Sequence, residues 1–137
     1  MKSIPLKASL VTVMMIAAAG LSAEEPQKAA AAVTPLVTRD LAGVPGKEVV
    51  MLTVEYPPGG ASTPHRHDAN VFVYVLEGSL IMQVKGQEPV TLNPGQTFYE
   101  NPSDVHVQSA NASQTKPAKF LVFTVKDKGV TTRSVSE

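Results

Sequence analysis

The segment 59–78, GGASTPHRHDANVFVYVLEG, narrows the possible structures of this chain more than any other stretch. Two prolines and a Gly-Gly pair at 57–60 separate it from the residues before it, because these residue types favour turns. His65 and His67 are two positions apart, and in an extended strand such side chains point to the same face. The run VFVYVL at 71–76 has the β-branched and aromatic residues of a buried strand. The segment therefore predicts paired imidazoles next to a buried strand.

Short apolar runs separated by Gly, Pro and Asn recur through the rest of the chain, and no helical periodicity follows the N-terminal region. We expect strands at residues 34–40, 48–56, 71–76, 79–85, 88–92, 97–100, 104–110 and 118–126. The third and fourth of these should form a hairpin across the turn at 77–78. The pattern predicts an all-β fold, either a sandwich or a barrel.

The first 23 residues have the pattern of a secretory signal peptide. Lys2 and Lys7 give a positive start, residues 8–19 are an apolar run, and Ala23 is a small residue before two glutamates. An apolar run of about a dozen residues is shorter than the ~20 that a membrane-spanning helix needs. We expect cleavage after Ala23 and a bacterial protein that is periplasmic or secreted, with an uncleaved membrane anchor as the alternative.

Composition divides the remaining chain into three parts. Residues 24–33 (EEPQKAAAAV) suggest a flexible spacer, residues 34–126 one β-barrel domain, and residues 127–137 a C-terminal tail or edge segment. A chain of this length can bury a small core of its own. There is no cysteine, so disulfides and a lipid-anchored lipoprotein form are excluded.

The charge balance indicates which partners to expect. The chain has 12 basic and 12 acidic residues, and loss of Lys2 and Lys7 with the signal peptide would leave 10 and 12, a net charge of about −2. No basic cluster occurs. This balance argues against nucleic acid as a partner and against an anionic membrane surface once the signal peptide is cleaved. A small-molecule ligand is the partner that we expect.

The three histidines of the chain are candidates for one metal site. His106 lies on the predicted strand 104–110, and the intervening strands can bring it opposite His65 and His67 in an antiparallel barrel. Three neutral imidazoles suit a divalent transition metal such as Fe, Mn, Ni, Cu or Zn, and they leave coordination positions open for water or substrate. A His-x-His pair taken alone is more often two surface histidines, so the surrounding pattern decides.

That surrounding pattern resembles the cupin family. Segment 59–78 is similar to the first cupin motif, a Gly-led stretch with His-x-His and a hydrophobic strand that ends in Gly. GQTFYENPSDVHVQSAN at 95–111 is similar to the second motif, with its Gly, Pro-containing turn, His and Asn. The resemblance covers roughly residues 49–123. It implies a small single-domain jelly-roll barrel with a metal site inside, often paired into homodimers through sheet edges.

The sequence departs from the family pattern at Val71, which stands where a metal-binding Glu is usual. A hydrophobic side chain cannot bind a metal ion, and Asp68 is the nearest carboxylate along the chain. The resemblance therefore implies His65, His67 and His106 as ligands, with water completing the coordination. A site without that Glu is one charge more positive, which favours an anionic ligand or a lower pKa for a metal-bound water.

Other residues near the proposed site are weaker candidates. Glu100 alternates with Phe98 and could be a buried acid near His106, but we expect it at the surface. Gln108 shares a face with His106, although ordinary packing explains it equally well. A tyrosine on a strand is more often a packing residue than a proton donor. The candidates for lining a substrate pocket are Asp68, Val71, Met82, Tyr99 and Gln108.

We expect a cupin-domain protein that binds one metal ion and acts on a small polar or anionic metabolite, by oxygenase, isomerase or lyase chemistry. The alternative is a non-catalytic barrel that binds a small molecule or a sugar derivative. The sequence assigns no catalytic residue. It also has no Gly-rich phosphate loop and no Ser-His-Asp set, which disfavours nucleotide chemistry and acyl transfer through a serine.

Overall fold

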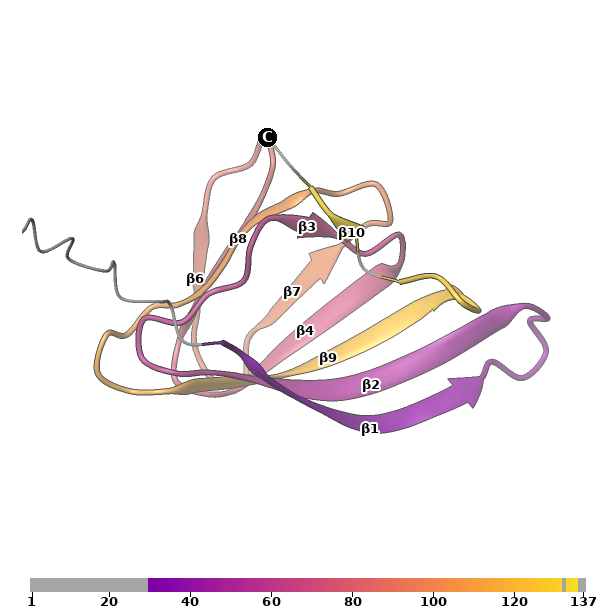
Figure 1. Cartoon of the computed structure of the whole chain (residues 1–137), viewed down its shortest axis with the longest axis horizontal. Helices are drawn as coiled ribbons and strands as arrows, with labels where there is room; N and C mark the ends of the chain where they lie inside the picture. Colours follow the sequence, from indigo (N-terminus) through magenta and orange to yellow (C-terminus); the bar gives the residue numbers. More distant parts are fainter. Residues whose placement is uncertain (1–29, 132, 136–137) are drawn as a thin grey trace, which may run out of the picture.

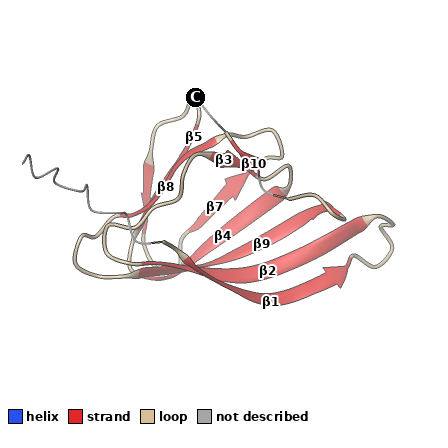
Figure 2. Cartoon of the chain, in the orientation of Figure 1, coloured by secondary structure: helices blue, strands red, loops and turns tan. Residues whose placement is uncertain are grey.

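The computed structural model describes residues 30–131 and 133–135. The expected signal peptide and most of the expected spacer lie outside these residues. In the described part every regular element is a strand (Figure 2), and no helix there is long and apolar enough to span a membrane. The strands are β1 (Ala32–Asp40), β2 (Lys47–Tyr56), β3 (His65–Arg66), β4 (Asn70–Glu77), β5 (Leu80–Val84), β6 (Val90–Leu92), β7 (Thr97–Glu100), β8 (His106–Asn111), β9 (Ala118–Asp127) and β10 (Arg133–Ser134).

The described strands form two five-stranded sheets that face each other (Figure 1). The strand order is β1-β2-β9-β4-β7 in one sheet and β10-β3-β8-β5-β6 in the other, and all pairs are antiparallel. Neighbours such as β2 and β9 are far apart in sequence, so the chain passes repeatedly from one sheet to the other. The predicted all-β jelly-roll fold is confirmed.

Alternation along the strands fills the space between the sheets. On β4, Val71, Val73 and Val75 are buried, whereas Phe72 and Tyr74 point to the opposite side of the sheet. β9 alternates in the same way, and β5 contributes buried positions from the facing sheet. Each fully buried valine-sized side chain stabilises the fold by roughly 1.5–3 kcal/mol. The period-two pattern of the sequence thus builds one continuous core.

The turn at 77–78 connects the two sheets and does not form the hairpin that the sequence predicted. β4 pairs with β7 and β9, whereas β5 pairs with β6 and β8. Gly78 has a φ of +70°, and a Cβ there would lie 2.5 Å from the carbonyl oxygen of Pro117. Glycine suits both constraints. The hairpin prediction was wrong because a short turn between two apolar runs has the same sequence pattern whether the runs pair or face each other.

β1 begins at Ala32, inside the segment expected to be a spacer. It forms the edge of its sheet, pairs with β2, and all of its residues are exposed. Pro35 cannot donate a backbone hydrogen bond, and the register with β2 shifts between Pro35 and Val37. Both features make this edge irregular, which disfavours the addition of a further strand.

Candidate metal centre

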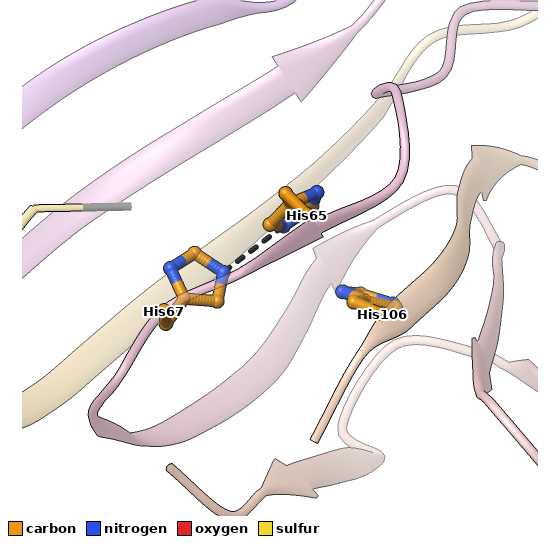
Figure 3. A group of neighbouring side chains, drawn as sticks. All are labelled: His65, His67 and His106. Atoms are coloured by element: carbon orange, nitrogen blue, oxygen red, sulfur yellow. Dashed lines mark hydrogen bonds between the residues drawn. The ribbon is translucent and has the colours of Figure 1, made fainter. Parts of the chain in front are cut away.

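The pairing of β3 with β8 brings together two histidines from distant parts of the sequence. His65 on β3 is directly opposite His106 on β8. Directly opposed residues of antiparallel strands share a face, with Cβ atoms about 4.5–5.5 Å apart. The centroids of the two imidazole rings are 5.1 Å apart. Figure 3 shows His65 and His67 on one strand segment and His106 on another, with the three rings around a common space.

His67 joins this pair although it lies just beyond the end of β3. The chain bends at Asp68, whose φ is +50°, and an ion pair of 2.7 Å between Arg66 Nε and Asp68 Oδ1 closes the bend. Nε2 of His67 lies 3.0 Å from Nε2 of His65 (Figure 3). The two imidazoles of the His-x-His motif therefore converge on one side of the segment.

Contacts around the rings indicate which nitrogens of His65 and His106 are available to bind a metal ion. Nδ1 of His65 is 2.7 Å from the carbonyl oxygen of Thr63. Because a carbonyl oxygen can accept but not donate, Nδ1 carries the proton and Nε2 keeps its lone pair. Both ring nitrogens of His106 are buried and have no hydrogen-bond partner among the described residues. A buried ring nitrogen in that situation is unfavourable unless something binds it.

The donor geometry fits a single metal ion. One ring nitrogen from each of His65, His67 and His106 lies within 4.8 Å of the other two. Two nitrogens bound at about 2.1 Å to the same ion are about 3.0–3.4 Å apart. The Nε2 atoms of His65 and His67, at 3.0 Å, already have this separation. The three-histidine group could hold a metal ion.

The structure adds an acidic residue that the sequence analysis placed at the surface. Glu100 ends β7, is only 2% exposed, and its Oε1 lies 3.2 Å from Nδ1 of His106. The expectation of an exposed Glu100 was wrong. Its alternation with Phe98, which packs against the core, was the available signal. The charge of the side chain argued against burial, because a buried carboxylate is unfavourable without a compensating partner.

The histidines line a cavity of about 670 Å³ between the two sheets, which is within the usual range for small-molecule sites. Tyr56 and Ser109, whose hydroxyls are 2.8 Å apart, and the Glu48–Lys126 ion pair contribute polar groups to its wall. Most of the wall is apolar and comes from Val50, Leu52, Val54, Val71, Val73, Met82, Phe120 and Val122. The cavity therefore suits a ligand with an apolar body and a few polar groups.

Of the five residues expected to line the pocket, two lie in the cavity wall and three lie outside it. Val71 and Met82 are fully buried and lie in the cavity wall. Tyr99 points to the outer face of its sheet, where it is 44% exposed and its hydroxyl donates to an asparagine side chain of β4. Asp68 and Gln108 also lie outside the cavity wall; Asp68 pairs with an arginine, and Gln108 is on β8.

Electrostatics favour the metal-binding form of His67. Burial lowers the pKa of His67 below its ordinary value. The charge of Glu100 raises this pKa, while His65 and His106 lower it further. The net shift is downward, so the imidazole favours its neutral form, which is the form that binds metal ions.

Comparisons with known proteins agree with this fold. The cupin domain family matches residues 52–124, just over half of the chain. Comparison with curated proteins found no match.

Several solved structures are similar to this chain. An oxalate oxidase in complex with the substrate analogue glycolate is 25% identical, with a TM-score of 0.60 over 77% of this chain and 55% of that one. The DMSP lyase DddQ from Ruegeria pomeroyi DSS-3 is 21% identical, with a TM-score of 0.57 over 64% and 43%. A cupin domain from Bordetella pertussis Tohama I is 20% identical, with a TM-score of 0.57 over 73% and 97%. The chain spans about half the length of the oxidase and the lyase, and the likeness to the lyase and the Bordetella domain concerns the fold alone.

Proposed function

This chain belongs to the cupin family, and from that premise we propose that it binds one transition-metal ion through His65, His67 and His106 and acts on a small molecule held in the barrel. One observation carries the proposal: three imidazole nitrogens lie within 4.8 Å of one another on the wall of a cavity of about 670 Å³. Fe, Mn, Ni, Cu and Zn all accept such a ligand set, so the residues do not select among them.

Residues of the chain would prepare the site for the ion. The carbonyl oxygen of Thr63 orients His65, and the β3–β8 register sets the distance between His65 and His106. The apolar wall keeps water away from a bound ligand. A bound ion supplies a Lewis acid with open coordination positions.

The cavity favours a small organic acid with an apolar part. Three neutral imidazoles leave the charge of a divalent ion unbalanced, so an anionic group of the ligand should meet the metal. The mainly apolar wall suits the remainder of such a molecule. Similarity to an oxalate oxidase bound to glycolate is consistent with a small acid. Oxygenase, isomerase or lyase chemistry is the activity that we propose to assay.

Metal analysis of the protein tests this proposal. The protein is purified from its native source without chelators, and its content of first-row transition metals is measured. We expect about one equivalent per chain, as for a mononuclear site. The identity of the metal then selects oxygen-dependent or Lewis-acid assays with small carboxylates. A folded protein that contains no metal and takes none up contradicts the proposal and favours the non-catalytic binding barrel.

We also propose that the protein is exported and is periplasmic or secreted. The support is the signal-peptide pattern of residues 1–23 in the sequence. N-terminal sequencing of the protein recovered from the periplasmic fraction should begin at Glu24. Retention in the membrane fraction with Met1 intact contradicts export by this route.

We further propose that two copies associate through the outer face of the sheet that contains β4. Phe72 and Tyr74 on β4 and Tyr99 on β7 are exposed there, and the rings of Phe72 and Tyr99 are 5.0 Å apart. Exposed apolar faces of this kind are typical of interaction surfaces.

A further inference from the structure

A buried acid stands beside the three histidines without belonging to their ligand group. Glu100 lines the cavity and is almost completely buried. A buried carboxylate is unfavourable unless a positive charge or hydrogen-bond donors compensate for it. Directly opposite Glu100 on β4 is Val71, which is apolar and equally buried. Val71 offers Glu100 no compensation, whereas His106 lies close to its carboxylate.

The contact of Glu100 is with His106. Its Oε1 lies 3.2 Å from Nδ1 of His106, and each side chain is 3% exposed. A carboxylate can only accept, so a hydrogen bond between the two groups would place the ring proton on Nδ1 and leave the lone pair on Nε2. The contact is not aligned as a hydrogen bond, so a rotation of either side chain is needed to complete it. Thr63 holds Nδ1 of His65 in the corresponding way.

Charge gives Glu100 a second role. The ligand group consists of three imidazoles and contains no carboxylate. In an apolar cavity, the charge of a divalent ion bound by neutral ligands is poorly balanced, and a nearby anion stabilises it. Glu100 lines the same cavity as the three histidines, so its charge lies on the side where the ion would be held.

From this geometry we propose that Glu100 is the positioning residue of the metal centre. It holds His106 in the tautomer and orientation that bind the ion, and it balances part of the ion's charge from outside the ligand group. The inference deepens the proposed function and rests on it. Loss of the carboxylate should weaken metal binding and leave folding intact.

Cobalt binding to the metal-free protein tests this role without an activity assay. Glu100→Gln removes the charge and keeps the shape, and Glu77→Gln makes the same change at an exposed position of β4. We expect Glu100→Gln to bind Co²⁺ about 10–100-fold more weakly, as is usual when an outer partner of a ligating histidine is lost. Its Co²⁺ absorption spectrum should change as well. Glu77→Gln should match the wild type in both measurements.

The stability of the metal-free protein separates positioning from a structural role. We expect the urea midpoint of metal-free Glu100→Gln to be no lower than that of the wild type, because burying an amide is less unfavourable than burying a carboxylate. The double variant Val71→Glu/Glu100→Gln returns a carboxylate to the directly opposed position. It should recover most of the lost Co²⁺ affinity.

The possible results distinguish a positioning role of Glu100 from a structural role and from the absence of a metal site. Wild-type affinity and spectrum in Glu100→Gln overturn the inference and leave the three-histidine centre standing. A lower urea midpoint with unchanged affinity assigns Glu100 a structural role and also overturns it. If Glu100→Gln does not fold, Glu100→Asp replaces it, and wild-type affinity in that variant overturns the positioning role. Absence of Co²⁺ binding by the wild type overturns the proposed function itself.

Discussion

At the scale of single residues, the proposed site depends most on His106, because it is the ligand that β8 contributes across from the His-x-His segment. His106→Ala should therefore abolish metal retention, since two imidazoles without a third donor hold a divalent ion weakly. Metal content after gel filtration measures this. Gln108→Ala, on the same strand but outside the cavity wall, is the control. Unchanged metal content in His106→Ala contradicts the three-histidine site.

Val71 gives a second prediction at this scale. Val71→Glu places a new carboxylate in the cavity wall beside Glu100, and in the metal-free protein this buried charge should lower the free energy of unfolding by about 3–5 kcal/mol. Added Zn²⁺ should restore more stability than it does in the wild type, because a carboxylate can join the ligands. Thermal unfolding with and without Zn²⁺ measures both effects. Val71→Gln is the uncharged control, and an equal response to Zn²⁺ in the two variants means that position 71 does not reach the ion.

Individual residues also show where sequence reasoning succeeded and where it stopped. The spacing of His65 and His67 indicated their convergence, because period-two geometry is local. Glu100 is buried and Tyr99 points outward for the same reason, because neighbouring residues on a strand face opposite sides of the sheet. The four-residue strand TFYE has no strong pattern of its own. The direction of its side chains is set by the other sheet, where His106 on β8 lies 3.2 Å from the carboxylate of Glu100.

At the scale of elements, the turn from β4 to β5 leaves no room for a side chain at Gly78. Gly78→Ala combines an unfavourable positive φ with a Cβ 2.5 Å from a carbonyl oxygen. Gly86 has a φ of +84° with no atom within 4 Å of an added Cβ. Gly86→Ala should therefore show the backbone strain alone, about 1–2 kcal/mol, and Gly78→Ala a further ~1–3 kcal/mol from overpacking. Urea unfolding measures the difference, and equal effects contradict the tight passage at Gly78.

The turn at residues 77–78 also shows what local sequence patterns cannot predict. The sequence correctly indicated strands on both sides of residues 77–78, because their apolar content is high. It could not indicate that β4 and β5 belong to different sheets. That assignment depends on β9, whose apolar strand pairs with β4 and occupies the position that a hairpin partner would take. β9 lies more than forty residues further along the chain than β4, so no local sequence pattern indicates that the two strands pair.

At the scale of the whole molecule, the sheet β1-β2-β9-β4-β7 has two different faces. Its inner face forms the cavity wall, and its outer face presents aromatic side chains on three neighbouring strands, β9, β4 and β7. The sheet edge at β1 is irregular at Pro35, which disfavours association through that edge. A second copy packed on the outer face is self-complementary under two-fold symmetry, because each copy contributes the same surface.

Phe72 lies at the centre of that outer face and tests the association. It is 46% exposed, and its ring contacts those of Tyr99 and Phe123 at centroid distances of 5.0 and 6.1 Å. The wild type should sediment as a dimer, and Phe72→Glu as a monomer, because two like charges would be desolvated at the interface. Val90→Glu makes the same kind of change at an exposed position of the other sheet and should remain dimeric.

The metal content of Phe72→Glu shows whether metal binding depends on association of the two copies. The side chain of Phe72 points away from the cavity, and its neighbours Val71 and Val73 form the wall. A monomeric Phe72→Glu should therefore bind metal as the wild type does. Dimers in Phe72→Glu, or a wild type that stays monomeric at high concentration, contradict association through this face. Loss of metal together with loss of the dimer shows instead that the second copy stabilises the barrel wall, and the two faces of the sheet are then coupled.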